Sequence, residues 1–410
     1  MIFFLSFCVV YRNPIILLPP FYGTNLWVTY NQTNLPWYCS KAENDSLLWL
    51  SPKYLFPYKV NCLFKLMTSF IDENDQIQDW PNTTVNIHDF GGEESVRYVV
   101  QSDLFHLKYG VSLANIIDHF KKLGWELKKD FFIAPYDWRL GPTFSEPFWP
   151  EFKKLIEQAY SLNNDTKVTI IGFSQGGFMA QQFLTKHCTE KFKENFISQC
   201  IFIAPSFTGN LQNMHNFWVK RMSLAPSLHF DSLSFCFEQM PSVHVHMPNE
   251  VIYEDFVLVI GPDGREYKGK DIYNLIMDHS LFNEDARRMY NKSELIMKIA
   301  PQDVGIKTTL LMNSGAKTLI RMNFSNGFNK DPINIFGDGD GTLHAYGHRW
   351  ICKNWNNITC VDFNNTDKSY QHYPLISNER VLNVISNITC YNKIPDLEND
   401  ELYVNDNDEL

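Results

Sequence analysis

The sequence predicts a mixed α/β fold with a mostly parallel central sheet, and three observations lead to that prediction. Short apolar runs typical of buried strands recur along the chain and alternate with segments of helical periodicity. Strands that alternate with helices favour parallel pairing, with helices on both faces of the sheet. A serine between two glycines, Ser174, separates the apolar run 168–171 from the helical segment 178–187. At 410 residues the chain can bury a large core.

The stretch around Ser174 has the pattern Gly-x-Ser-x-Gly between a strand and a helix, which is typical of the nucleophile elbow of α/β-hydrolases. The turn is so tight that a Cβ at Gly172 or Gly176 would clash. It holds the serine hydroxyl above the sheet edge, beside a helix N-terminus that stabilises negative charge. The alternative is a glycine-rich turn with an ordinary serine. We expect the α/β-hydrolase fold, with Ser174 as the nucleophile.

The other expected elements follow from the same patterns. The first strand is expected over 14–18, and the strand over 358–363 is expected to close the sheet. A helix is expected over 113–120, with Ser112 as its N-cap. Further helices are expected over 152–160 and 178–187, and further strands over 131–134, 168–171, 200–204, 308–312 and 333–336.

Two stretches break this alternation. Residues 35–75, here called the excursion, are bounded by cysteines and rich in aromatic side chains, and residues 209–306 are irregular and indicate an inserted cap. The expected organisation is a signal peptide at 1–12, an α/β-hydrolase core at 13–34, 76–208 and 307–395, the excursion at 35–75, the cap insertion at 209–306 and an acidic tail at 396–410.

A serine hydroxyl is a poor nucleophile unless a base and an orienting carboxylate assist it. In this fold the acid and then the histidine follow the serine along the chain. Asp340 is the expected acid, because it follows the strand over 333–336 and Leu343 can anchor its turn. Asp338 is the alternative, and a calcium-like Asp/Gly loop is a third interpretation that lacks the remaining ligands.

The expected base is His372, which lies after the last strand. His344 and His348 are closer to the expected acid in sequence, but they would lie in the helix that follows it and are expected to be structural. The oxyanion hole needs two backbone N–H donors. Gln175, the residue after the nucleophile, is one expected donor, and Phe21 is the other, since Pro20 has no N–H.

The charge and the aromatic content of the chain indicate which class of molecule it binds. A formal net charge of −10 argues against nucleic acid. An aromatic content of 15% suits contact with lipid or other apolar ligands, and an apolar loop can bind a membrane surface without net positive charge. His244 and His246 could bind zinc from one strand face, but no third ligand follows at a suitable spacing. No metal and no cofactor are expected.

Several features indicate the secretory pathway. The apolar stretch 2–10 is too short to span a bilayer and fits a signal peptide, with a buried first strand as the alternative. The final four residues resemble an endoplasmic-reticulum retrieval signal, with a frayed acidic tail as the alternative. Setting Cys8 aside, eight cysteines remain, and Cys39–Cys62, Cys352–Cys360 and Cys188–Cys200 are candidate pairs. Nine Asn-x-Ser/Thr sequons occur, at Asn31, Asn44, Asn82, Asn164, Asn291, Asn323, Asn357, Asn364 and Asn387.

The motifs together resemble those of the lecithin:cholesterol acyltransferase family, which includes the lysosomal phospholipase A2. The matching stretches, in family order, are Asn-Pro-Ile-Ile-Leu-Leu-Pro from residue 13, Ala-Pro-Tyr-Asp-Trp-Arg from 134, Gly-Phe-Ser-Gln-Gly from 172, Gly-Asp-Gly-Asp-Gly-Thr from 337 and Gln-His from 371. The resemblance implies that Ser174, Asp340 and His372 are catalytic. It also implies oxyanion positions at Phe21 and Gln175.

The resemblance further implies a function and a membrane-binding segment. A glycerophospholipid would give its acyl chain to the serine, which passes it to a lipid alcohol (a sterol, ceramide or diacylglycerol) or to water. The excursion would be closed by Cys39–Cys62 and dock on a membrane surface, with Trp49, flanked by Leu48 and Leu50, at its exposed tip. An enzyme of the lysosome or vacuole, secreted or retained in the endoplasmic reticulum, with no transmembrane helix, is expected.

The chain departs from the family pattern near the expected oxyanion hole. Phe173 and Gln175 replace the usual His and Leu, and Pro20 replaces a Gly. The residues 206–209, Ser-Phe-Thr-Gly, replace the usual Trp-Gly-Gly. Two other functions remain open at this point: a hydrolase similar to lysosomal palmitoyl-protein thioesterases, which share Gly-Phe-Ser-Gln-Gly-Gly, and a non-catalytic lipid-binding relative.

Overall fold

The computed structural model describes residues 12–31, 34–56, 58–102, 107–219, 231–279, 282–391 and 401–403. The predicted signal peptide, apart from Arg12, and the Asn-Asp-Glu-Leu end of the chain lie outside these ranges.

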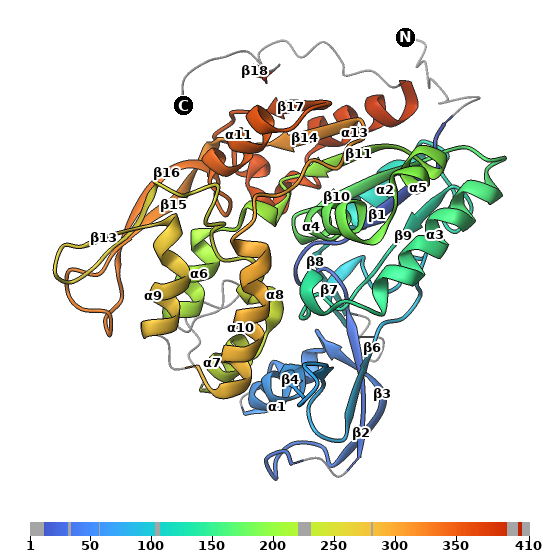
Figure 1. Ribbon diagram of the computed structural model, residues 1–410. Coiled ribbons are helices and arrows are strands. Elements are labelled where there is room, and N and C mark those ends of the chain that lie inside the picture. Colours follow the sequence, from blue (N-terminus) through green and yellow to red (C-terminus); the bar gives the residue numbers. More distant parts are fainter. Residues whose placement is uncertain are drawn as a thin grey trace.

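A seven-stranded sheet forms the centre of the fold, in the order β18-β17-β14-β11-β10-β1-β9 (Figure 1). Every neighbouring pair is parallel except β17 and β18, which are antiparallel. The predicted α/β class with a mostly parallel sheet is confirmed. The strand predicted to close the sheet is not its edge, because β18 pairs outside it. The strands are β1 Ile15–Leu18, β9 Phe131–Ile133, β10 Val168–Phe173, β11 Ile197–Ile203, β14 Thr308–Met312, β17 Ile358–Asp362 and β18 Glu401–Tyr403.

Helices cover both faces of this sheet. Successive strand residues point to opposite faces, so that Ile170 packs in one buried cluster and Ile171 in the other. The first cluster holds side chains of α3 Phe148–Leu162, α4 Gln175–Gln182, α5 Glu190–Phe196 and α11 Ala345–Asn354, and the second holds those of α2 Ala114–Lys122, α12 His372–Leu375 and α13 Glu379–Tyr391.

The predicted helices exist, but the predicted cap of α2 is wrong. Leu113 occupies the N-cap position of α2 and makes no side-chain capping bond. The hydroxyl of Ser112 donates instead to the carbonyl of Gly23, 89 residues away. A tertiary contact with the loop after β1 has taken the place of the local cap that the sequence indicated.

A second sheet has the order β13-β12-β15-β16 and combines strands from the predicted cap and from the later core segment. The prediction that 333–336 is a buried strand is wrong. β16 is an edge strand antiparallel to β15, and Ile333 and Phe336 are exposed. A short apolar run does not show which sheet a strand joins. The strands are β12 Val257–Ile260, β13 Glu266–Lys268, β15 Gly315–Asn323 and β16 Ile333–Asp340.

The described residues of 209–306 form a mainly helical layer beside the sheet, at the left of Figure 1. Their helices are α6 Leu211–Val219, α7 Asp231–Glu238, α8 Pro241–Val245, α9 Ile272–His279 and α10 Glu284–Met297. Contacts of α8 with α10 and of α6 with α7 hold the layer together.

The excursion packs on a three-stranded antiparallel sheet, β3-β2-β6, at the lower end of the molecule in Figure 1. The predicted Cys39–Cys62 disulfide is confirmed and ties the segment before β3 to α1. The elements of this region are β2 Leu26–Asn31, β3 Ala42–Trp49, α1 Lys59–Met67, β4 Phe70–Ile71, β5 Ile77–Gln78 and β6 Thr83–Asn86, with the hairpin β7 Tyr98–Ser102 and β8 Leu107–Val111 nearby.

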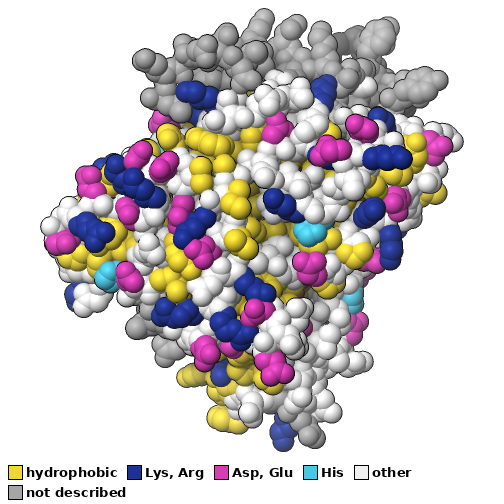
Figure 2. Space-filling model, in the orientation of Figure 1, with side chains coloured by type: hydrophobic (Ala, Val, Ile, Leu, Met, Phe, Trp, Pro, Cys, Tyr) yellow, Lys and Arg dark blue, Asp and Glu magenta, His cyan; other side chains and the backbone are white. Residues whose placement is uncertain are grey.

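The prediction that Trp49, with Leu48 and Leu50, forms an exposed tip is wrong. Trp49 is 1% exposed, and both neighbours are buried. The reason is the strand register, since Trp49 pairs with Leu26, the first residue of β2, at the end of β3 that lies against the core. The exposed apolar side chains of the excursion are Trp37, Leu55, Phe56 and Tyr58. Figure 2 shows yellow hydrophobic side chains at this lower end of the molecule.

Of the other two predicted cysteine pairs, one is confirmed and one is wrong. The Cys352–Cys360 disulfide is confirmed. The candidate pair Cys188–Cys200 is wrong, because both residues are thiols. Within the described ranges, no helix is both long enough and apolar enough to cross a bilayer.

Candidate active site

Ser174 lies on a sharp turn between β10 and α4. Its backbone has φ 53° and ψ −118°, a strained conformation for a residue with a side chain. The flanking glycines permit the turn: a Cβ at Gly172 would lie 2.6 Å from Cα of Gly177, and one at Gly176 would lie 2.3 Å from the carbonyl oxygen of Leu18. The elbow predicted from the sequence is therefore present as a local structure.

The imidazole of His372, at the start of α12, lies between Ser174 and Asp340. Its Nε2 is 2.9 Å from Oγ of Ser174, and its Nδ1 is 2.7 Å from Oδ2 of Asp340. An ionised carboxylate only accepts hydrogen bonds, so Nδ1 carries the hydrogen and Nε2 is the acceptor for the serine hydroxyl. All three side chains are buried. The structure brings together the three residues that the sequence selected from distant parts of the chain.

Asp340 is held in place by its own turn. Its Oδ1 accepts hydrogen bonds from the N–H groups of Thr342 and Leu343, at 2.9 and 2.7 Å. Burial alone would raise the pKa of Asp340, but the charge and hydrogen bond of His372 and the N–H of Leu343 lower it below its ordinary value. The carboxylate is therefore ionised over the physiological pH range. The alternative acid, Asp338, is mostly exposed and faces Arg349.

His344 and His348 lie where the sequence expected them. His344 is the N-cap residue of α11, and His348 is inside that helix. The Nε2 of His348 lies 2.9 Å from the carbonyl oxygen of Pro205. Burial lowers the pKa of His344 to about 4 and also lowers that of His348. His348 is buried and His344 is partly buried, and neither contacts Ser174 or His372 by a hydrogen bond among the described residues.

The two expected oxyanion positions, at the start of α4 and in the loop after β1, suit hydrogen-bond donation by the backbone. Gln175 is the first residue of α4, so its N–H has no acceptor within the helix. Phe21 is the second residue of a turn that is closed by the N–H of Gly23 on the carbonyl of Pro20, at 2.9 Å. The hydrogen bond that closes this turn does not involve the N–H of Phe21.

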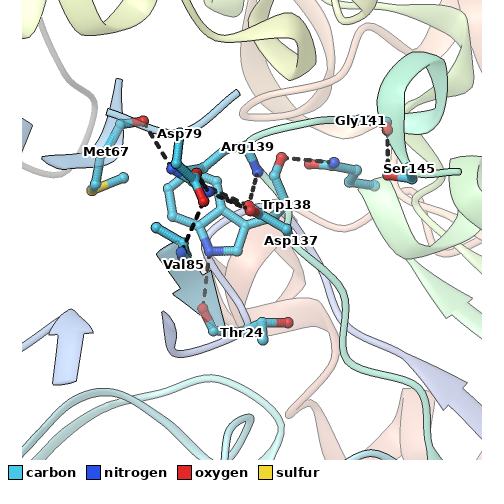
Figure 3. Close-up of polar contacts among 10 residues, drawn as sticks. Thr24, Met67, Asp79, Val85, Asp137, Trp138, Arg139, Gly141 and Ser145 are labelled. Atoms are coloured by element: carbon cyan, nitrogen blue, oxygen red, sulfur yellow. Dashed lines mark hydrogen bonds and ion pairs between the residues drawn. The ribbon is translucent and has the colours of Figure 1, made fainter. Parts of the chain in front are cut away.

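Two residues that the sequence analysis did not assign, Trp138 and Arg139, join these loops to the excursion (Figure 3). The indole N–H of Trp138 donates to the carbonyl of Thr24. The guanidinium of Arg139 is almost fully buried and contacts Asp137, Asp79 and the carbonyl of Met67. The only sequence signal for them was the Tyr-Asp-Trp-Arg string, which served as a family signature without a role for each residue.

His244 and His246, considered above as zinc ligands, make other contacts. The Nε2 of His244 bonds to the carbonyl of Glu238, and the two ring nitrogens of His246 bond to the hydroxyl of Ser206 and the carbonyl of Ser242. Burial lowers the pKa of His244 to about 3 and that of His246 to about 4. Among the described residues, no group of three or more potential ligands is arranged to hold a metal ion.

A small pocket lies next to the loop that follows β1. Phe21 and Tyr22 line it from the core, and Phe217, Phe237 and Val243 line it from the helical layer. Asn213 and Asn216 also line it, so its wall is a mixture of polar and apolar groups.

The sheet, the elbow and the Ser–His–Asp arrangement at one edge of the sheet define an α/β-hydrolase fold. Residues 45–321 match the family described as lecithin:cholesterol acyltransferase, so that two thirds of the chain is covered. The chain belongs to this family, and the resemblance inferred from its motifs is confirmed.

Two curated relatives are similar to the chain over most of its length. It is 22% identical to the lysosomal phospholipase A and acyltransferase of Bos taurus, over 83% of this chain and 83% of that protein. It is 24% identical to the phosphatidylcholine-sterol acyltransferase of Gallus gallus, over 84% of this chain and 82% of that protein. Among solved structures, the crystal structure of the Tle4-Tli4 complex matches with a TM-score of 0.51 and 13% identity, over 90% of this chain and 96% of that chain. That likeness shows the fold alone.

Proposed function

We propose that the chain is a serine-dependent lipid acyltransferase and phospholipase that acts on glycerophospholipids. The observation that carries the proposal is the hydrogen-bonded series from Ser174 through His372 to Asp340. Family membership supports the substrate class, since the printed names of the relatives describe phospholipase A and phosphatidylcholine-dependent acyl transfer.

The proposed first step is acylation of the serine. Oγ of Ser174 attacks the ester carbonyl as Nε2 of His372 takes the hydroxyl proton. Asp340 stabilises the imidazolium that forms, and the N–H groups of Phe21 and Gln175 stabilise the negative charge on the carbonyl oxygen. The C–O bond to the glycerol then breaks, and the lyso-lipid leaves with the proton from His372.

The second step reverses these roles. A lipid alcohol or water gives its proton to His372 and attacks the acyl-serine, which releases the acylated product and restores the hydroxyl of Ser174. Which acceptor prevails depends on how far water is excluded from the site.

The excursion is the proposed membrane-docking element. Trp37, Leu55, Phe56 and Tyr58, here called the tip, are exposed apolar side chains of one disulfide-bonded segment. Burying each in the lipid interface would contribute roughly 1.5–3 kcal/mol. This is enough for reversible, peripheral binding to a phospholipid surface. Retention of the chain on sedimented phosphatidylcholine vesicles is the expected result.

The reaction is tested with labelled phosphatidylcholine vesicles, with and without a sterol, ceramide or diacylglycerol. We expect labelled fatty acid and, with the preferred alcohol, its labelled ester. The Ser174→Ala variant should lose about 10⁴-fold or more of this turnover and all labelling by a fluorophosphonate. If wild-type protein releases no labelled acyl chain while it cleaves an acyl thioester, the phospholipid proposal is wrong. If the serine is never labelled, the chain is a non-catalytic relative.

We also propose that the protein follows the secretory pathway. Two disulfides support this, since such bonds persist in oxidising compartments. Glycosidase treatment of protein from the native host should lower its mass; an unchanged mass would contradict the proposal. The sequon asparagines that are exposed, and therefore available for a glycan, are Asn31, Asn44, Asn82, Asn164, Asn291, Asn357 and Asn364.

A further inference from the structure

Trp138 lies between the two expected oxyanion positions. Its ring contacts that of Phe21 edge-on, with centroids 5.0 Å apart. Its carbonyl oxygen accepts a hydrogen bond of 3.0 Å from the side-chain amide of Gln175. Its indole N–H donates to Thr24, three residues after Phe21. One buried residue therefore touches both loops that would supply the oxyanion donors.

The excursion fixes the position of this residue. Arg139, directly after Trp138, donates to the carbonyl of Met67, the last residue of α1 in the excursion, and to the carboxylate of Asp79, just beyond the excursion and β5. Figure 3 shows these groups gathered around the Trp138 indole. A buried guanidinium needs its full set of partners, so the loop with Trp138 cannot shift without breaking contacts to the excursion.

Trp49 is connected to the loop that follows β1, which carries Phe21, through two peptide planes. Its ring stacks on Tyr22 and meets Trp138 at a centroid distance of 5.0 Å in each case. Its indole N–H donates to the carbonyl of Tyr22 at 3.1 Å. The same peptide unit carries the N–H of Gly23, which donates to the carbonyl of Pro20.

The peptide unit between Pro20 and Phe21 completes the connection. The carbonyl of Pro20 and the N–H of Phe21 belong to one planar group, so a bond that orients the first also orients the second. The orientation of the expected oxyanion donor is thereby linked to an indole in the excursion, by two hydrogen bonds and two rigid planes. Oxyanion stabilisation depends on donors held close to the position of the developing charge.

We propose that Trp49 and Trp138 are positioning residues for the oxyanion hole, so that the excursion is a structural part of the catalytic centre as well as a membrane-docking element. The proposal rests on the function proposed above. It explains why an aromatic residue within a surface-binding segment is fully buried. It also assigns a role to Gln175, whose side chain replaces the family's usual apolar one and reaches Trp138.

The test uses a short, soluble ester, which removes the need for membrane binding. Trp49→Phe keeps an aromatic ring and removes the N–H that holds Tyr22, and Gln175→Met keeps the side-chain length and removes the bond to Trp138. Trp355→Phe is the matched control. Trp355 is equally buried and donates to the carbonyl of Pro301, and among the described residues no hydrogen bond or ring contact joins it to Phe21, Trp138 or Gln175.

We expect each of the two test variants to lower kcat about tenfold or more with KM within twofold, because the lost interaction acts in the transition state. Binding of a trifluoromethyl ketone, which forms a tetrahedral oxyanion on Ser174, should weaken by the same factor. Trp355→Phe should change neither quantity by more than twofold. The inference is overturned if Trp49→Phe and Gln175→Met match the control, or if only KM rises. If Trp49→Phe does not fold, Gln175→Met alone decides the outcome.

The result separates this inference from the proposed function. If wild-type protein cleaves the soluble ester but not phosphatidylcholine, and Trp49→Phe still lowers kcat, the substrate is wrong and the positioning role stands. If phosphatidylcholine is cleaved and the variants match the control, the function stands and the positioning role is wrong.

Discussion

The excursion has two ends of similar composition and opposite environment. Its root, Leu48, Trp49 and Leu50, is buried at the point where β3 meets the core. At the tip, Trp37 is 92% exposed. Both ends are aromatic and apolar, so residue type alone does not separate them. Strand pairing separates them, because the register of β3 on β2 places Trp49 opposite Leu26 at the core, whereas the tip residues lie outside both strands.

The two ends of the segment have different surroundings. The root contributes to the main hydrophobic core and holds the loop after β1. The tip residues are outside that core, and they form the surface that we propose to dock on lipid. We therefore expect substitutions at the two ends to affect different measurements.

Truncation at the root should cost the most stability. Trp49→Ala removes a fully buried indole and should lower the free energy of unfolding by about 3–5 kcal/mol. Trp37→Ala, at the tip, should change it by no more than about 0.5 kcal/mol. Urea denaturation of both variants measures the difference. Equal costs at the two positions would contradict the division into root and tip.

Removal of the disulfide of the excursion should have the next largest effect. Its cysteines are 23 residues apart, and replacing both Cys39 and Cys62 by serine should cost about 2–4 kcal/mol. The loop of the second bridge, Cys352–Cys360, spans only 8 residues, so its removal should cost less. Denaturation under oxidising conditions compares the two double variants. A larger loss from the shorter loop would show that loop length does not govern the effect here.

These two regions also show what the sequence could and could not predict. The positions of Ser174, Asp340 and His372 were predictable because each lies at or beyond the C-terminal end of a strand, and the short turn from Asp340 to Leu343 is local. The strand before Asp340 was nevertheless assigned to the wrong sheet, and this did not matter because the turn sets the carboxylate. The burial of Trp49 was not predictable, since it depends on pairing with Leu26, which is distant in sequence. The hydroxyl of Ser112 was misassigned for the same reason.

Replacement of tip side chains should weaken membrane binding without loss of stability. Trp37→Ser and Phe56→Ser each remove an exposed aromatic worth roughly 1.5–3 kcal/mol when buried. Each variant should bind phosphatidylcholine vesicles about tenfold more weakly or worse in a sedimentation assay. Turnover of a short soluble ester should be unchanged. If soluble-ester turnover falls as much as vesicle binding, the tip is not a separate docking surface.

The smallest effect is expected between the two ends, at the ion pair of Glu43 and Lys53, where Nζ lies 2.9 Å from Oε1. Burial raises the pKa of Glu43, but the hydrogen bond and charge of Lys53 lower it below its ordinary value. Folding therefore favours the ionised carboxylate. Its contribution to stability is fully present above about pH 4.5, the range of an unfolded Glu, and is lost as the pH falls through the lower pKa of the folded state.

Because Lys53 is more than one third exposed, the contribution should not exceed about 1 kcal/mol. Glu43→Gln should lower the free energy of unfolding by that amount at pH 7 and leave it equal to wild type once the pH is below the pKa of the folded state. Glu151→Gln, which removes a more exposed pair with Lys154 on α3, is the control and should have no measurable effect at either pH. A Glu43→Gln difference that grows as the pH falls would reverse the sign of the linkage, and would mean that the middle of the excursion is held by burial of a neutral carboxyl group.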